Sequence, residues 1–114
     1  IASSSPHDWV DGHLTRLGLF PSFDVIKARE DVQRPKPEPD LFLSALSALD
    51  VQPDQAVVFE DSPNGVKAAK RAGIFVVAVP NPLTVQLKFD GEDMRLASLA
   101  DLPLDGLFRR INLN

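Results

Sequence analysis

The sequence predicts an α/β fold, a Rossmann-like parallel sheet with helices on both faces. Two apolar runs of strand length, residues 57–59 and 74–79, flank a segment rich in helix-forming residues. Shorter strand-like runs and helical patterns of about ten residues alternate through much of the remaining chain. With 114 residues and 44% apolar content, the chain is long enough for a single domain with one core.

The first quarter of the chain indicates a strand end, a helix and a short strand. Residues 1–3 look like the end of a strand, and a helix is expected over residues 6–17, with Ser5 as its cap and Gly18 as its stop. Residues 23–26 are expected to form a short strand before a polar segment. Spacings of three and four predict the core face of the helix, formed by Trp9 or Val10, His13, Leu14 and Leu17.

A proline-rich segment precedes the second predicted helix. Pro35, Pro37 and Pro39 alternate with other residues, and each fixes its own backbone and restricts the residue before it, so Lys36 lies on a stiff loop. The helix is expected over residues 39–49. Its predicted core face consists of Leu41, Phe42, Ala45, Leu46 and Leu49.

The second half of the chain continues the alternation. The strand at residues 57–59 is followed by Ser62 as a helix cap, Pro63 at the first helical position and Gly73 as the stop. Residues 74–79 predict a buried strand. Weaker patterns indicate a helix or turn at residues 84–89, a strand at 94–96 and a helical turn at 104–111.

Composition excludes several classes of function. Twelve basic and sixteen acidic residues are interspersed and give a net charge of −4, so no nucleic-acid partner is expected. No apolar run is long enough to cross a bilayer, so we expect no membrane partner. The absence of cysteine excludes disulfides and thiolate chemistry and is compatible with a cytoplasmic protein, which is our expectation.

Three polar clusters follow three strand-like runs. They are the serines at residues 3–5, Lys36, and Glu60 with Asp61. Parallel strands end at the same edge of a sheet, where ligands bind in open α/β folds, so we expect the clusters to meet there. Hydroxyls, a fixed cation and a carboxylate pair suit a phosphate bridged to Mg²⁺. Alternatively, the serine cluster only caps a helix, and the carboxylates only favour the positive end of the following helix.

These segments resemble the motifs of the haloacid dehalogenase superfamily. The strand ending at Ser3 is similar to its second motif, and the Lys-Pro-x-Pro-Asp segment beginning at Lys36 is similar to its third. The Glu-Asp-Ser-x-x-Gly segment beginning at Glu60 is similar to its fourth. The three occur in order over residues 1–82 and resemble the β-phosphoglucomutase-like and phosphoglycolate phosphatase-like subgroup.

The resemblance implies a role for each of these residues. Ser3 and Lys36 would be catalytic: with Ser4 they would bind the phosphoryl group of a small phosphorylated metabolite, and Lys36 would neutralise its charge. Asp61 and Glu60 would hold Mg²⁺, directly or through water. His7 and His13 lie in no matching motif, and we expect both to be structural.

The first motif of the superfamily, an Asp-x-Asp sequence, is absent from this chain. In the family its first Asp attacks phosphorus and its second protonates the leaving group. We therefore expect residues 1–114 to be the C-terminal part of a core domain, without its cap domain and inactive alone. The segment that carries the nucleophile would be its partner. The missing central strand would leave a gap of two strand spacings, about 9.6 Å.

The leading hypothesis is a segment of a Mg²⁺-dependent phosphohydrolase that acts through an aspartyl-phosphate on a small phosphomonoester. A β-phosphoglucomutase would share every motif present here. From a different class, a noncatalytic phosphate-binding or regulatory protein would also retain these residues if it had lost the nucleophile.

Overall fold

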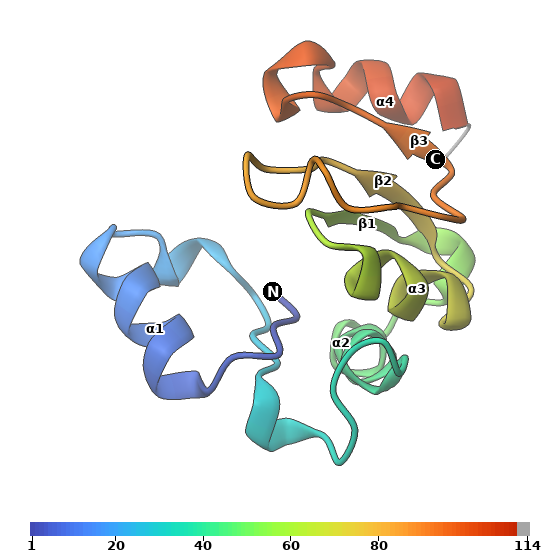
Figure 1. The fold of residues 1–114 in the computed structure, drawn as a ribbon. Helices are drawn as coiled ribbons and strands as arrows, with labels where there is room; N and C mark the ends of the chain where they lie inside the picture. Colours follow the sequence, from blue (N-terminus) through green and yellow to red (C-terminus); the bar gives the residue numbers. More distant parts are fainter. Residues whose placement is uncertain (112–114) are drawn as a thin grey trace.

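A parallel three-stranded sheet forms the centre of the computed structural model, which describes residues 1–111. The strands are β1 (Val57–Glu60), β2 (Phe75–Ala78) and β3 (Met94–Arg95), in that spatial order. Val58 of β1 is opposite Val76 of β2, and both pairings are parallel. The predicted α/β class and the parallel sheet are therefore confirmed (Figure 1).

Four α-helices accompany the sheet in the described part of the chain, at the positions that the sequence predicts. They are α1 (His7–Arg16), α2 (Asp40–Leu49), α3 (Pro63–Arg71) and α4 (Leu104–Ile111). Residues 82–86 form turns, in agreement with the weak pattern there. Single 3₁₀ turns complete the connections: η1 (Phe20–Ser22), η2 (Arg29–Asp31), η3 (Pro53–Gln55) and η4 (Leu99–Asp101). None of the described helices is long and apolar enough to cross a membrane.

The main core combines α2, α3 and one face of the sheet. Successive side chains of a strand alternate between faces, and Val76 and Ala78 of β2 belong to this core. Val77, on the opposite face, is also fully buried. Small residues on the inner side of α3 allow the helix to pack closely on the sheet. The buried members of the core are Phe42, Leu46, Val58, Val66, Ala68, Ala69, Ala72, Ile74, Val76 and Ala78.

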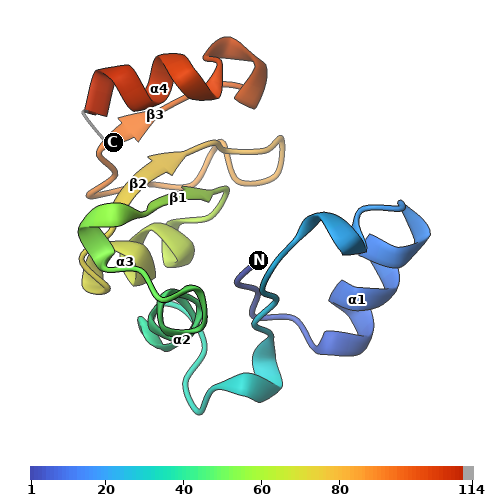
Figure 2. The ribbon, with the colours of Figure 1, turned by 180° about the vertical axis from the view of Figure 1, so that it is seen from behind.

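The predicted core face of the first helix is confirmed in part. Val10, one of the two alternatives at its start, is buried, and His13 and Leu14 are partly buried. Leu17 is wrong, at 60% exposed, and Trp9, the other alternative, is 59% exposed. The reason is that α1 packs beside η1 and lies apart from the sheet, as both views show (Figures 1 and 2). The same expectation fails at the end of α2, where Leu49 is exposed.

Ser5 does not cap α1. The capping position is Pro6, which has no side-chain cap, and the Glu30 carboxylate accepts the backbone N–H of His7 at 3.0 Å. A carboxylate from another segment thus satisfies the helix N-terminus in place of a local hydroxyl. Gly18, by contrast, has the positive φ of +72° expected after a helix end.

The strand predicted at residues 23–26 does not form as a regular strand. One bridge joins Ala2 and Lys27, with backbone bonds of 2.9 Å from Lys27 N to Ile1 O and from Ser3 N to Lys27 O. This pair of segments is not hydrogen-bonded to the three-stranded sheet, and Figure 2 shows the N-terminus apart from β1. Without a paired neighbour on the β1 side, the ladder stays short.

Candidate functional site

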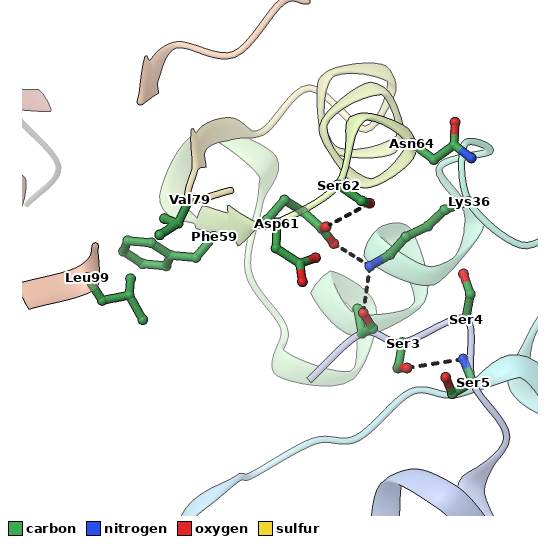
Figure 3. A pocket seen from close by; sticks show the side chains of 12 residues that line it. Ser3, Ser4, Ser5, Lys36, Phe59, Asp61, Ser62, Asn64, Val79 and Leu99 are labelled. Atoms are coloured by element: carbon green, nitrogen blue, oxygen red, sulfur yellow. Dashed lines mark hydrogen bonds and ion pairs between the residues drawn. The ribbon is translucent and has the colours of Figure 1, made fainter. Parts of the chain in front are cut away.

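A pocket of about 660 Å³ lies at the carboxyl ends of β1 and β2. Figure 3 shows its side chains converging from the serine segment, the proline-rich loop and the end of β1. All five predicted site residues line it. The complete lining is Ala2, Ser3, Ser4, Ser5, Lys36, Phe59, Glu60, Asp61, Ser62, Asn64, Val79 and Leu99.

Lys36 connects the serine segment at the N-terminus with the end of β1. Its Nζ donates to the Ala2 carbonyl at 2.8 Å and forms an ion pair with the Glu60 carboxylate. The side chains of Lys36 and Glu60 are only 12% and 8% exposed, and Nζ lies 4.8 Å from the centre of the Phe42 ring. An ammonium has three protons to donate, so these two acceptors leave one for a ligand in the pocket.

The loop that carries Lys36 is tied to its surroundings. Arg71 of α3 donates to the Pro37 carbonyl at 3.3 Å and contacts the Glu38 carboxylate at 3.4 Å. On the other side, the Arg34 guanidinium contacts the Asp40 carboxylate at 2.9 Å. The Lys36–Pro37 peptide bond is cis. These contacts hold the loop against α2 and α3, so the lysine has a defined position.

The serine segment is held by its own bonds and by the segment after residue 26. Ser3 Oγ accepts the backbone N–H of Ser5 at 3.1 Å, and the Ser5 carbonyl accepts the N–H of Arg29 at 3.0 Å. Because Oγ of Ser3 is the acceptor in this bond, its own proton is available for donation to a ligand. The predicted phosphate donor therefore also shapes its loop.

His7 braces the segment from outside the pocket. Its Nε2 lies 2.5 Å from Asp31 and its Nδ1 lies 3.3 Å from Asp11. Hydrogen bonds to Asp31 first, and to Asp11 second, raise the pKa of His7 above its ordinary value. The backbone N–H of Ala28, followed by His7, lowers the pKa of Asp31. His7 therefore supports α1, as expected for a structural residue.

The acidic pair lies at the junction of β1 and α3. Ser62 caps α3, because its Oγ accepts the N–H of Gly65 at 3.1 Å, and the same hydroxyl lies 3.4 Å from Glu60 Oε2. A Cβ on Gly65 would lie less than 3.0 Å from all three atoms of the Glu60 carboxylate. The buried Glu60 carboxylate therefore requires a glycine at position 65, in the first turn of α3.

Asp61 has a different environment. It is exposed, and its Oδ2 accepts a hydrogen bond of 2.9 Å from the side-chain amide of Asn81. Asn81 was not among the predicted site residues because it belongs to no recognised motif. Its position in the sequence could have indicated a site residue. Asn81 lies three residues after the end of β2, between two prolines, and ligands of parallel α/β sheets bind at the carboxyl ends of the strands.

The carboxylates fit one part of a magnesium site. Within residues 1–111, no cluster of three or more His, Cys, Asp or Glu residues could hold a metal ion. Mg²⁺ nevertheless needs only one or two carboxylates when substrate phosphate and water complete its shell. Asp61 offers an exposed carboxylate for this purpose, whereas Glu60 is already paired with Lys36.

Comparison with known proteins identifies relatives along the whole chain. The sequence profile of the haloacid dehalogenase-like hydrolases matches residues 1–79. The protein YhcW of Bacillus subtilis is 47% identical over 112 residues, which are 98% of this chain and 51% of the relative. Validoxylamine A 7′-phosphate phosphatase of Streptomyces hygroscopicus is 48% identical over 79 residues, which are 69% of this chain and 37% of the relative.

Solved structures agree with the sequence relatives. CbbY from Rhodobacter sphaeroides, in complex with phosphate, matches with a TM-score of 0.87 and 39% identity over 93% of this chain and 49% of that protein. The chain thus spans about half the length, or less, of these relatives. The match covers the serine segment, the lysine loop, the acidic pair and both longer strands. The chain therefore belongs to the haloacid dehalogenase-like hydrolase family.

Proposed function

We propose that this chain is the C-terminal core segment of a Mg²⁺-dependent phosphohydrolase that acts on small phosphomonoesters. The observation that carries the proposal is the shared pocket, in which a partly buried lysine, a serine hydroxyl and an exposed carboxylate surround one space. Phosphoryl transfer relies chiefly on positioning and electrostatic stabilisation, and these groups supply both. The proposal extends the family membership of the chain to a specific reaction.

Each residue has a separate task in this proposal. Ser3 donates its hydroxyl proton to a phosphoryl oxygen, and Ser4 supports the same binding loop. Lys36 donates its remaining proton to another phosphoryl oxygen and balances the negative charge that accumulates there. Asp61 would hold Mg²⁺, which would neutralise further charge on the transferring group. Glu60 holds the Lys36 ammonium and contributes to the metal site through water.

The nucleophile must come from outside residues 1–114, because the chain contains no Asp-x-Asp sequence. In the proposed reaction, a carboxylate oxygen of that segment bonds to phosphorus while the bond to the leaving oxygen breaks. A second carboxyl group gives its proton to the leaving oxygen, and water then hydrolyses the aspartyl-phosphate. This fragment alone is therefore expected to be inactive.

A groove beside β1 supports the proposal of such a segment. A groove of about 310 Å³ separates Ile1 and Ala2 from residues 57–60 of β1. In the sheet, β1 pairs only with β2, so the backbone groups on the groove side of β1 have no strand partner within the described chain. A strand from the preceding part of the full-length protein would pair with both sides. Its end would then reach the pocket next to Ala2 and Glu60.

Relatives indicate the class of substrate. A Thermotoga maritima relative, 45% identical over 74 residues, is named phosphorylated carbohydrates phosphatase. CbbY has also been solved in complex with xylulose-(1,5)bisphosphate. The pocket of this chain has one apolar side, formed by Phe59, Val79 and Leu99, opposite the polar groups. We therefore propose a small sugar phosphate, with its phosphate on the polar side.

The test is phosphate release by the full-length protein from p-nitrophenyl phosphate and a panel of sugar phosphates, with Mg²⁺ or with EDTA. We expect turnover that requires Mg²⁺ and falls at least about 100-fold in Lys36→Met, since removal of one preorganised charge-stabilising donor costs this much in other enzymes. Lys70→Met is the matched control, because Lys70 pairs with Asp93 outside the pocket. Absence of Mg²⁺-dependent turnover on every substrate would count against the proposal.

A sugar-phosphate phosphomutase is the second candidate. The β-phosphoglucomutase of Clostridium difficile matches this chain with a TM-score of 0.76 and 26% identity over 89% of the chain. Phosphorus NMR of a sugar monophosphate incubated with the full-length protein separates the two activities. A mutase moves the phosphate to another position of the sugar, whereas a phosphatase releases inorganic phosphate. Phosphate binding without either reaction would favour the noncatalytic alternative.

A further inference from the structure

We propose that Asn81 is a positioning residue for the metal-binding carboxylate of Asp61. This inference rests on the proposed function and adds a residue that lies outside the three recognised motifs. Asn81 follows β2 by three residues, and Asp61 follows β1 by one. The two strands are hydrogen-bonded neighbours, with Glu60 opposite Ala78, so their ends bring the two side chains together.

The side chains of Asn81 and Asp61 are in direct contact. Nδ2 of Asn81 donates to Oδ2 of Asp61 at 2.9 Å, within the normal range for a hydrogen bond. Asp61 lies on the exposed turn between β1 and α3, where its side chain would otherwise sample several rotamers. One oxygen held by an amide restricts the carboxylate and leaves Oδ1 for a cation.

The turn after β2 fixes the orientation of the Asn81 amide. Its Oδ1 accepts the backbone N–H of Leu83 at 2.8 Å and the backbone N–H of Thr84 at 2.9 Å. Only the oxygen end of a carboxamide can accept these two bonds, so the NH₂ end must be the one that faces Asp61. The turn thereby determines that Asn81 presents a donor, and not an acceptor, to the carboxylate.

The turn that begins at Asn81 is held by several hydrogen bonds. Thr84 Oγ1 accepts the backbone N–H of Asn81 at 3.0 Å, and the Asn81 carbonyl accepts the N–H groups of Thr84 and Val85 at 3.1 and 2.9 Å. Pro80 and Pro82 on either side of Asn81 fix their own backbone angles. The amide is therefore held before any ligand binds.

Hydrogen bonds to ligating carboxylates commonly affect metal affinity by about 10- to 100-fold. Removal of the Asn81 donor should accordingly weaken Mg²⁺ binding within this range. The phosphate-binding side of the pocket should be unaffected, because within residues 1–111 neither Ser3 nor Lys36 forms a side-chain hydrogen bond with Asn81. The predicted defect is therefore one of metal affinity, which saturating Mg²⁺ overcomes.

The experiment compares two variants of the full-length protein. Asn81→Ser keeps a hydroxyl that can accept the N–H groups of the turn but is too short to reach Asp61. Thr84→Val removes the hydroxyl that accepts the Asn81 N–H and donates to Asn81 Oδ1 at 3.2 Å. The two backbone N–H groups that donate to the same oxygen, and the Asn81–Asp61 contact, stay in place. Titration calorimetry with Mg²⁺ alone measures affinity, and the Mg²⁺ dependence of kcat and KM is measured separately. Thermal unfolding monitors damage to the turn.

We expect Asn81→Ser to weaken Mg²⁺ binding about 10- to 100-fold and to recover kcat at saturating Mg²⁺. Thr84→Val should bind Mg²⁺ within about twofold of the parent, even where its unfolding temperature falls. Equal losses of affinity in both variants would show that Asn81 acts only through the turn and would overturn the inference, as would unchanged affinity in Asn81→Ser. If the parent protein binds no Mg²⁺ and has no activity, the proposed function fails as well.

Discussion

The close approach of Glu60 to α3 gives the sharpest prediction for stability. Gly65 lies in the first turn of α3, directly beneath the Glu60 carboxylate. In Gly65→Ala the new methyl group would come within 3.0 Å of Cδ, Oε1 and Oε2, a separation that real Cβ atoms essentially never show. The carboxylate must therefore move, although it is buried and paired with Lys36.

Two opposing terms determine the size of the effect. Disruption of a buried ion pair so that one charge loses its partner costs about 3–5 kcal/mol. Alanine is better than glycine in a helix by about 1 kcal/mol, which offsets part of this loss. The net expectation is a decrease of about 2–4 kcal/mol in the free energy of unfolding, together with lower activity as the Lys36 ammonium loses its anchor.

A matched control is present in the same chain. Gly12 lies within α1, and nothing lies within 4 Å of a Cβ placed there. Gly12→Ala should therefore stabilise the protein by about 0.5–1 kcal/mol, through helix propensity and a less flexible unfolded chain. Urea unfolding of the full-length protein measures both variants, and phosphate release shows whether the pocket is altered.

The two identical substitutions are predicted to have opposite signs. If Gly65→Ala were as stable as Gly12→Ala and fully active, the carboxylate of Glu60 would not occupy the space over α3. The Lys36–Glu60 pair would then not be fixed in this position. If Gly65→Ala lowered stability but left activity unchanged, the Lys36–Glu60 pair would matter for folding and not for catalysis.

Three further predictions follow from the same contacts. Lys36→Met should destabilise the full-length protein by about 3–5 kcal/mol because it leaves the Glu60 charge buried without a partner, and Lys36→Met/Glu60→Gln should recover at least half of the loss in urea unfolding. Ser62→Ala should cost about 0.5–2 kcal/mol through loss of the α3 cap, which circular dichroism during thermal unfolding would detect; no change would show that the cap is unimportant. The raised pKa of His7, caused first by Asp31, means that its stabilising contribution is fully present below about pH 6.5 and is lost as the pH rises through the higher folded-state pKa. Comparison of His7→Gln with the parent between pH 5.5 and 8.5 should therefore show the larger difference at the acidic end, and an equal difference at all pH values would contradict this.

The sequence predicted well those elements whose neighbours are present in the chain. Apolar runs predicted β1 and β2, and Ser62, Pro63 and Gly73 predicted the ends of α3, because these signals act locally or within one core. The expected strand at residues 23–26 did not form, and the predicted core face of α1 was wrong at Leu17. Both patterns describe surfaces that need a further partner, and in this structure Trp9 and Leu17 have none that covers them.

In the candidate site, too, some features could be predicted from the sequence and others could not. The expected meeting of Ser3, Lys36 and the acidic pair at one sheet edge follows from parallel topology alone, and these residues line one pocket. Their catalytic and metal-binding roles remain predictions. The Asn81 contact with Asp61 could not be predicted from a motif, because it depends on the course of the turn after β2.

The position of the Lys36 ammonium between the Ala2 carbonyl and the Glu60 carboxylate has a consequence for tolerance to mutation. The same group joins the serine segment to the end of β1 and, in the proposed function, faces the phosphate of the substrate. Arginine would preserve the charge, but its planar guanidinium is larger than a compact ammonium and cannot reproduce the same donor directions toward Ala2, Glu60 and a ligand. A lysine-to-arginine exchange, ordinarily mild on a protein surface, would here loosen the architecture and impair recognition at once.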